Sequence, residues 1–473
     1  MATRIDLNPV TRQNGLSRIA VEVEGGRVRE AWCGGLLMRG FEQILLGRHP
    51  EDAPYLTARV CGICSTAHAV AAALALEDAS PVEVPPNGVW LRNLILGADL
   101  LQNHIRHLHI MALPDFVPGL NLFGPAPTRG DFRLTPRQVE EYRKHHEAAV
   151  AASRQAHEMA ATFAGRIPHH RTIMPGGNLW GPTSDRILRF RQLLDRVYAF
   201  IRDRLVPGIQ ELGELYPDYY QLGSRPANFL NFAMFPQPAG QGDPLFPAGA
   251  VIEGRWEKVD LRQITEDIRY SWYDEREGRR RALDGRPQPA LSEEKADAYS
   301  WVKAPRYRGQ PMEGGPLARL WLKGFYRRGV SVLDRLMARA LETKLVAEEM
   351  YRWLDALQPG QPSITPWRAP RRAEGIGLTG AMRGPLAHYV RIENYRIAGY
   401  QIITPSAWNL SPRDNEGRRG PAEEALLGTP VRDPHFPVEL GRVYRSFDPC
   451  NACSTHLWVL DAAGREVGRV RLG

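Results

Sequence analysis

Four of the five cysteines in this 473-residue chain form two C-x-x-C pairs, one near each end of the sequence. Cys61 and Cys64 make up the first pair, and Cys450 and Cys453 make up the second. Together they offer four thiolates, which are ligands that zinc and the softer transition metals prefer. The spacing leaves two kinds of site open: a structural zinc site with four cysteine ligands, and a metal centre assembled inside a folded core.

The separation of the two pairs along the chain favours the second kind of site. A zinc ribbon or knuckle usually closes a short local loop, because its metal folds a small module, whereas nearly the whole chain separates Cys64 from Cys450. Such sparse cysteine usage is also unlike that of a secreted disulfide scaffold. The fifth cysteine, Cys33, stands alone, and we expect it to be a small buried residue without a redox role.

A histidine follows each pair. His68 comes four residues after Cys64, and His456 comes three residues after Cys453. If a helix begins at Cys64, His68 lies on the same face one turn later and can donate a hydrogen bond to a metal-bound thiolate. A lone histidine would more simply be a core residue, but two histidines in matching positions favour a role at the metal.

Both motifs resemble signatures of one known family. RVCGICSTAH (59–68) is similar to R-x-C-G-x-C-x-x-x-H, and DPCNACSTH (448–456) is similar to D-P-C-x-x-C-x-x-H, which mark the large, catalytic subunits of nickel–iron hydrogenases. The chain looks most like the respiratory or uptake type. The resemblance continues in MRGFEQILLGRHPEDA (38–53), NHIRHLHIMALPDF (103–116), IPHHRTIMPGG (167–177), MRGPLAHYVRIENYRIAGYQIITPSAWNLSPRD (382–414) and GPAEEALLGTPVRDP (420–434).

The resemblance implies reversible, heterolytic cleavage of H2 to protons and electrons. It implies a nickel held by four cysteine thiolates and an iron that carries carbon monoxide and cyanide. By position, Cys61 and Cys450 would be terminal nickel ligands, and Cys64 and Cys453 would bridge the two metals. Soft thiolates suit nickel, and a terminal thiolate can accept the proton when H2 splits.

The resemblance also implies catalytic and supporting residues around this centre. Arg383 matches an arginine over the open metal position, where its permanent charge can orient or polarise H2. Asp448 and Asp115 match carboxylates clustered around that arginine, and Ser406 matches a residue that hydrogen-bonds a cyanide. An ordinary ion pair is the alternative for each charged residue.

A second metal is implied near the C-terminus. Glu42, the backbone carbonyl of Ile402 and His456 match a site that usually holds magnesium and is sometimes assigned as iron. A carboxylate and a carbonyl oxygen are suited to magnesium, whereas a histidine ligand is unusual for it.

The chain departs from the family pattern at positions close to the centre. Where the family has T-R-I-E-G-H, this chain has TRQNG, so Asn14 replaces a glutamate thought to carry protons, and Leu16 replaces the histidine. An amide cannot release a proton near neutral pH. We therefore expect protons to leave by another route, through Arg383 with Asp448 and Asp115, or turnover to be slow. Met382 replaces the proline that usually precedes the arginine.

Partners and processing follow from the same resemblance. The four paired cysteines leave none for iron–sulfur clusters, so a separate iron–sulfur small subunit would receive the electrons. The tail 457–473 would be removed between His456 and Leu457 by a maturation endopeptidase, after nickel-insertion factors have acted. An ordinary terminal hairpin is the alternative interpretation of the tail.

Two other functions remain as alternatives. A hydrogen-sensing regulatory hydrogenase of low turnover would use the same centre, although such sensors generally lack a tail. A zinc-stabilised structural subunit is disfavoured because all four cysteines and Arg383 are present.

The elements that must position these residues are mostly helical. We expect a single large domain (1–473), mainly α, built on a long-helix bundle with small β pieces, and 217–315 as a Pro- and Gly-rich insertion on the core. Alternating patterns predict hairpins at 16–35, around Gly25-Gly26, and at 379–404, turning near Glu393-Asn394. Helical patterns cover 65–79, 87–113, 136–163, 184–215 and 317–357.

Composition excludes several classes of protein. The 61 basic and 53 acidic residues give a net charge of +8 that is spread along the chain, so we predict no nucleic-acid partner. The N-terminus lacks the apolar stretch of a secretory signal, and no apolar run is long enough for a membrane span. We expect membrane association or export as a complex through the small subunit, or otherwise a cytoplasmic location.

Overall fold

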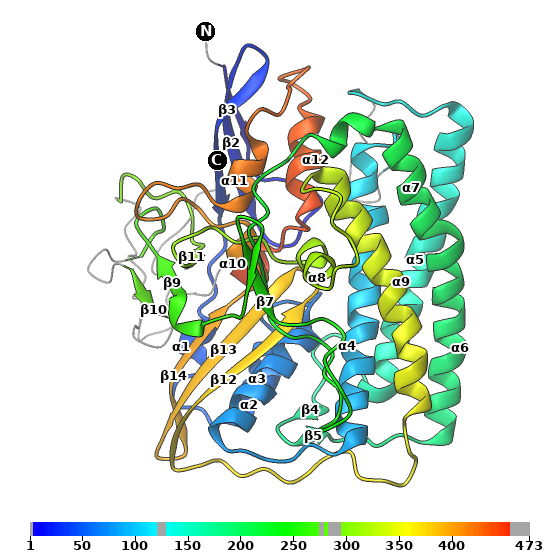
Figure 1. The fold of residues 1–473 in the computed structure, drawn as a ribbon, viewed down its shortest axis with the longest axis vertical. Helices are drawn as coiled ribbons and strands as arrows, with labels where there is room; N and C mark the ends of the chain where they lie inside the picture. Colours follow the sequence, from blue (N-terminus) through cyan, green and yellow to red (C-terminus); the bar gives the residue numbers. More distant parts are fainter. Residues whose placement is uncertain (1–2, 121–128, 274–278, 282–294, 455–473) are drawn as a thin grey trace, which may run out of the picture.

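The computed structural model describes residues 3–120, 129–273, 279–281 and 295–454, except for the side chains of residues 280, 281, 453 and 454. The fold is one domain with 42% helix and 20% strand, which confirms the prediction of a mainly α protein with small β pieces. Long helices form one side of the molecule, and small sheets form the other (Figure 1). In the described part of the chain, every helix is too short or too polar to cross a membrane.

The helical side is a bundle around one buried helix. In α4, every residue between Asn87 and Ile105 is buried except Val89, because neighbouring helices cover it on all sides. A helix with side chains buried all round lies at the centre of a core. The bundle consists of α4 (Pro86–Arg106), α5 (Pro136–Ala164), α6 (Ser184–Phe200), α7 (Val206–Leu215) and α9 (Val332–Asp355).

Capping residues start these helices where the sequence predicts. The Thr135 side chain accepts a hydrogen bond from the backbone of Gln138, whose own side chain bonds back to Thr135, and Pro136 occupies the first helical position. This capping box satisfies amide groups that the first helical turn leaves without partners. The Thr183 side chain caps α6 in the same way, by accepting from the Arg186 amide.

The prediction of one long helix over 317–357 is wrong. The structure has a short helix, α8 (Pro316–Leu322), and then α9, separated by a loop. Gly324 takes a positive φ of 76° just after α8, and Ser331 caps the start of α9 by accepting a hydrogen bond from the Asp334 amide. A helix-ending glycine followed by a strong N-cap creates two helices from one periodic pattern.

Two of the predicted helices also contain π-helical turns. After α4 the chain continues as a π-helix at His107–Ala112, and another π-helix, Ile201–Leu205, joins α6 to α7. Pro207 follows the second of these turns and lies at the start of α7, where its missing N–H does not break the helix.

The N-terminal sheet contains the predicted hairpin and one more strand. Strands β2 (Ser17–Glu24) and β3 (Arg27–Gly35) turn at Gly25 and Gly26, which both have positive φ. Strand β1 (Thr3–Leu7), which the sequence did not reveal, pairs with β2 on its other side.

A second antiparallel sheet, with the order β12-β13-β14, lies beside the bundle. The predicted turn near residue 393 connects β13 (Gly384–Glu393) to β14 (Arg396–Ile403), and β12 (Arg372–Ala381) adds a longer strand than expected. The turn between β12 and β13 consists of Met382 and Arg383.

The Ala-rich helix α3 (Ser65–Ala79) packs closely on β12 (Figure 1). A Cβ added to Gly377 would lie 1.9 Å from the Ala71 carbonyl oxygen, and one added to Gly375 would lie 2.1 Å from that of Ala75. Glycine in the strand and alanine in the helix therefore let the two backbones meet. This packing holds α3, whose first turn follows Cys64, against the strand that leads to Arg383.

The described part of segment 217–315 forms small sheets on this framework. One sheet holds β6 (Phe229–Asn231), β7 (Gly249–Ile252) and β8 (Arg255–Glu257), and the other holds β9 (Ile264–Asp267), β10 (Arg280–Arg281) and β11 (Ala304–Tyr307). Phe229, Met234 and Phe246 are fully buried in the main core, so this segment also supplies core side chains.

Candidate metal centre

The structure brings thiols from the two ends of the chain together. Cys61 and Cys64 lie in the turn between α2 (Asp52–Thr57) and α3, and Cys450 comes directly before α13 (Asn451–Ser454). The Sγ atoms of Cys61 and Cys450 are 3.4 Å apart. All three cysteines are buried, with at most 4% of each exposed. Cys453 belongs to α13, but its thiol lies outside the described part of the structure.

Backbone pairing holds the last cysteine pair against the N-terminal segment. The Asn14 amide donates to the carbonyl oxygen of Pro449 (3.3 Å), and the Asn451 amide donates to that of Asn14 (2.7 Å). Gly15 has a φ of 82°, and a Cβ there would lie 2.4 Å from the Ala452 nitrogen. Asn14 therefore lies directly alongside Cys450, and its buried Nδ2 makes no hydrogen bond within the described structure.

Arg383 is held beside the thiols by two neighbours. Its Nε donates to the Asp448 carbonyl oxygen (2.7 Å), and its Nη2 donates to Asn103 Oδ1 (2.9 Å) and Asp448 Oδ1 (3.0 Å). Burial acts to lower the pKa of Arg383, but the negative charges of Asp448 and the cysteines raise it well above its ordinary value. The buried Nη1 forms no hydrogen bond with any described residue, so it can donate to a bound group.

Asp448 links Arg383 to the bundle. Its Oδ2 accepts hydrogen bonds from Asn103 Nδ2 (2.9 Å) and Arg339 Nη1 (3.0 Å). Although burial acts to raise the pKa of Asp448, the arginines lower it overall, so the carboxylate is ionised. Sequence reasoning assigned no role to Asn103 or Arg339. For Asn103 the only signal was a polar residue in a helix core, which it shares with Asn93, Asp99 and Gln102.

Asp115 lies elsewhere than predicted. Its carboxylate accepts from Arg445 Nη1 (2.6 Å) and from Arg12, and no described contact joins it to Arg383. Burial alone would raise the pKa of Asp115, but these two arginines lower it. Asn103, and not Asp115, occupies the place beside Arg383 because the chain turns through the π-helix and a 3-10 turn before it reaches Asp115.

Ser406 and His68 lie close to the cysteines. The Ser406 Oγ, in α10 (Pro405–Asn409), accepts from the Cys450 amide (3.3 Å). His68 Nδ1 lies 3.1 Å from His388 Nε2, and the Nε2 of His68 is buried without a described partner. Burial lowers the pKa of His68 to about 4, so the ring is neutral at pH 7.

Two of the three residues expected to hold a second metal, Glu42 and Ile402, lie together. Glu42 Oε1 accepts from the Ile402 amide (2.9 Å), which brings α1 (Phe41–Ile44) to strand β14. Lys303, which the sequence did not single out, places its Nζ 3.9 Å from Glu42 Oε2 and 3.5 Å from Glu266 Oε2. His456 lies outside the described residues, as do Leu457 and the tail 457–473.

The donor set fits a metal group that carries ligands of its own. Buried thiols from both ends of the chain satisfy a soft metal. A four-cysteine zinc ion has no atom that needs a further donor, whereas here an N–H of Arg383 that has no partner among the described residues adjoins the thiols. A bound group with exposed acceptor atoms would satisfy it.

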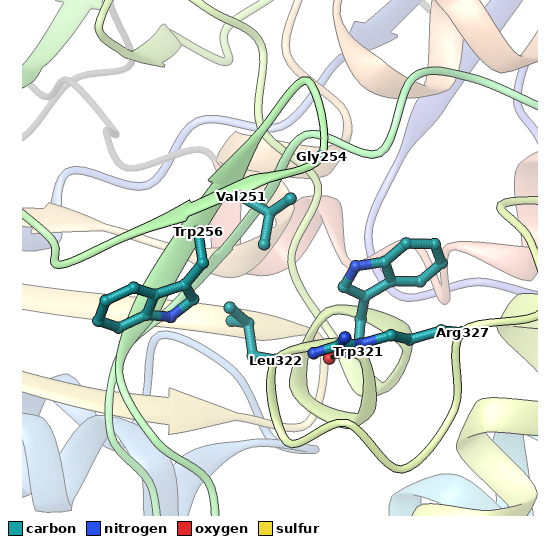
Figure 2. Close-up of a pocket in the computed structure, with 6 residues that line it drawn as sticks. All are labelled: Val251, Gly254, Trp256, Trp321, Leu322 and Arg327. Atoms are coloured by element: carbon teal, nitrogen blue, oxygen red, sulfur yellow. Dashed lines mark hydrogen bonds between the residues drawn. The ribbon is translucent and has the colours of Figure 1, made fainter.

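A surface pocket of about 350 Å³ lies apart from these residues, between the β7–β8 hairpin and α8 (Figure 2). Trp256, Trp321 and Arg327 are among the residues that line it, and the Trp256 side chain is 63% exposed. None of the residues that line it belongs to the sites described above.

Comparisons with known proteins indicate one family over nearly the whole chain. The sequence model of the nickel-dependent hydrogenase family matches residues 39–129, 128–327 and 322–456. The periplasmic [NiFeSe] hydrogenase large subunit of Desulfomicrobium baculatum is 36% identical and aligns with 96% of this chain and 95% of its own length. The hydrogenase-2 large chain of Escherichia coli K12 is 29% identical, and all of both chains is covered.

Solved structures lead to the same family. The Ni-Fe-Se hydrogenase of D. vulgaris Hildenborough in the reduced state superposes with a TM-score of 0.92 at 36% identity, covering 96% of this chain and all of the other. A further relative by sequence, the uptake hydrogenase large subunit of Rhizobium leguminosarum bv. viciae, is 30% identical and aligns with 99% of this chain and 97% of its own length.

Proposed function

Because this chain belongs to the nickel-dependent hydrogenase family and is a large, catalytic subunit acting on H2, we propose that H2 is split at a nickel–iron centre held by Cys61, Cys64, Cys450 and Cys453. The observation that supports this centre best is the 3.4 Å approach of the Cys61 and Cys450 sulfurs beside the spare N–H of Arg383. By position, Cys61 and Cys450 would hold the nickel, and Cys64 and Cys453 would hold both the nickel and the iron.

When bound, this centre supplies the binding position for H2 and accepts the electrons, with carbon monoxide and two cyanides completing the iron. Arg383 would donate from Nη1 to one cyanide and would present a fixed positive charge to H2. Ser406 accepts from the Cys450 amide through its oxygen, which leaves its O–H to donate to the other cyanide. The burial of the thiols excludes bulk water and strengthens these interactions.

Cys450 is the residue that we propose accepts the proton from H2, because a terminal thiolate is a base next to the metal. The onward route differs from the family pattern at Asn14, since a carboxamide cannot release a proton. Asp115 does not contact Arg383 in the described structure, so the expected route through Arg383, Asp448 and Asp115 is not continuous through direct contacts. Since Arg383 stays protonated and Asp448 stays ionised, the proton would leave Cys450 by another path.

A magnesium ion, or iron in its place, would be held by Glu42, the Ile402 carbonyl and His456. The hydrogen bond between Glu42 and the Ile402 amide supports the pairing of these two residues, and oxygen ligands suit magnesium. The positive charge of Lys303 would balance the negative charges of Glu42 and Glu266, which lie on either side of it.

The relatives are large subunits, so this chain works with a small subunit. We propose that this partner carries the iron–sulfur clusters that take the electrons away, because the four paired cysteines leave none for a cluster. We also propose removal of 457–473 after His456 by a maturation endopeptidase, once nickel-insertion factors have loaded the site. Intact mass of the active enzyme tests this cleavage, and a retained tail would refute it.

We propose that the complex is exported or membrane-associated through the small subunit, as the relative from D. baculatum is named periplasmic. The hydrogen-sensing alternative has no support in the relatives, whose names are those of enzymes.

The decisive experiment is to purify the chain with its small subunit. We expect nickel and iron in equal amounts at the centre, infrared bands of metal-bound carbon monoxide and cyanide, and steady H2 uptake with an artificial acceptor. Cys450→Ser should abolish the bands, whereas Cys33→Ser, which changes a buried cysteine outside the centre, should retain them. Finding zinc alone would overturn the proposal.

A further inference from the structure

A chain of buried polar side chains lies behind Arg383. His104 of α4, Arg319 of α8 and Glu342 of α9 are fully buried, and Arg339 of α9 is 2% exposed. Glu342 Oε2 accepts from Arg319 Nη2 (2.8 Å) and lies 2.8 Å from His104 Nε2. Arg339 Nη1 lies 2.9 Å from His104 Nδ1. The four side chains therefore form one continuous network across three helices.

The network reaches Arg383 from two directions. Arg339 donates to Asp448 Oδ2 (3.0 Å), and the other oxygen of Asp448 holds the Arg383 guanidinium. Arg319 donates to the carbonyl oxygens of Ala381 (2.8 Å) and Met382 (3.3 Å), the two residues directly before Arg383. Both the side chain of Arg383 and the turn that carries it are thus tied to Glu342.

The hydrogen bonds in this network have a fixed direction. Arginine only donates, so His104 Nδ1 must accept from Arg339, and its Nε2 must then carry the hydrogen that is donated to Glu342. Burial, together with the charge of Arg339, lowers the pKa of His104 to about 4, so the neutral ring suits this arrangement. One tautomer of His104 therefore connects Arg339 to Glu342, the carboxylate that also accepts directly from Arg319.

Global stability does not account well for such a network. Buried ion pairs repay little of the free energy needed to remove their charges from water, and apolar replacements are often as stable. What the network supplies is a defined position for groups that would otherwise have several rotamers.

We propose that Glu342 and His104 are positioning residues for Arg383: through Asp448 on one side and Arg319 on the other, they fix the guanidinium over the thiols. This inference rests on the proposed function, because Arg383 acts on H2 only if the metal centre is present.

The test uses the purified complex with its small subunit and compares Glu342→Gln with the unchanged enzyme. We expect kcat per nickel to fall about 10- to 100-fold, as for a catalytic group displaced by about 1 Å. The nickel and iron contents should stay the same, and the cyanide infrared bands should shift. His104→Gln should give a change in the same direction, and it provides the test if Glu342→Gln does not yield a loaded complex.

A double mutant distinguishes positioning from general damage. If Glu342 acts through Arg383, then adding Glu342→Gln to Arg383→Lys should change kcat less than about 2-fold, because the group it positions is already gone. Asp414→Asn is the matched control, since it also removes the charge from a fully buried arginine–carboxylate pair, with Arg306. It should lower the Tm and leave kcat per nickel unchanged.

The outcomes separate the two proposals. Full kcat and unchanged cyanide bands in both Glu342→Gln and His104→Gln would overturn the positioning role while leaving the hydrogenase centre in place. If Glu342→Gln lowers kcat by the same factor in the Arg383→Lys background as in the enzyme with Arg383, the positioning role is overturned as well. If the enzyme without any substitution lacks the infrared bands of metal-bound carbon monoxide and cyanide, the proposed centre itself is refuted.

Discussion

Arg383 shows how much a single side chain depends on its immediate partners. Its guanidinium has five N–H donors, and Asn103 and Asp448 hold it through Nε and Nη2 while Nη1 stays free of described partners. Asn103 is the neutral member of this group and bonds to both charged neighbours. It fixes the Arg383 side chain relative to that of Asp448 without adding a second carboxylate.

Asn103→Ala should therefore lower turnover. We expect kcat per nickel to fall about 10-fold or more, because Arg383 loses one of the groups that orient it. The free energy of unfolding should fall by about 1–3 kcal/mol, as two buried groups lose a partner. Asn93→Ala is the control: Asn93 lies on the same helix and also bonds through a buried amide, to the Pro236 carbonyl, away from the centre. Unchanged turnover in Asn103→Ala would contradict the assignment.

Asn14→Glu tests the missing proton carrier. Asn14 lies beside Cys450, where a carboxylate could take a proton that an amide cannot. We expect H2 oxidation per nickel to rise or stay the same. Asn14→Gln, which has a similar size and no titratable group, should not raise it. A large loss in Asn14→Glu with normal metal content would show that the carboxylate does not serve this enzyme.

The close packing of α3 on β12 helps to position Cys64 and Arg383 relative to each other. The helix begins just after Cys64, and the strand ends just before Arg383, so their contact sets the distance between a thiol and the guanidinium. The alanines and glycines at this contact leave no room for a larger side chain.

Gly377→Ala should separate this helix and strand. The new methyl group would lie 1.9 Å from the Ala71 carbonyl oxygen, so one backbone must move. We expect a loss of about 1–3 kcal/mol in the free energy of unfolding and less nickel per protein, measured by denaturation and by elemental analysis. Gly181→Ala is a suitable control because its Cβ would meet only Ser363 Oγ, at 3.6 Å. Normal stability in Gly377→Ala would contradict the packing argument.

Several histidines are buried in and around the bundle in the described structure. For four of them burial is the main cause that lowers the pKa, to about 4 for His104 and His170 and to about 3 for His107 and His109. In the unfolded chain the same groups bind protons near pH 6.5. At these four histidines the folded state therefore binds fewer protons than the unfolded state between about pH 6.5 and pH 4.

The stability that these four histidines contribute should fall as the pH drops through that window and stay level above it. At pH 5 each such histidine should lower the free energy of unfolding by about 2 kcal/mol relative to pH 7.5. The measurement is the Tm of the complex across this range. His170→Gln should reduce the dependence, whereas His435→Gln, at an exposed histidine, should not. A Tm that stays constant down to pH 4.5 would contradict this account.

Local patterns in the sequence were sufficient for much of this protein. The C-x-x-C motifs with their histidines indicated the centre, Thr135 and Pro136 marked a helix start, and Gly25-Gly26 marked a hairpin. These features depend on residues that are neighbours in the chain, so the information needed to find them is local.

Contacts between distant segments needed the tertiary structure. Nothing in the sequence distinguished Asn103 from Asp115 as the partner of Arg383, or connected Glu342 to the turn at 381–383. Side chains many residues apart meet only after helices and strands have packed, and the packing depends on the shapes of all the buried surfaces together. Chain-local chemistry therefore predicted the metal ligands, while the position of each described group around them was decided by the fold.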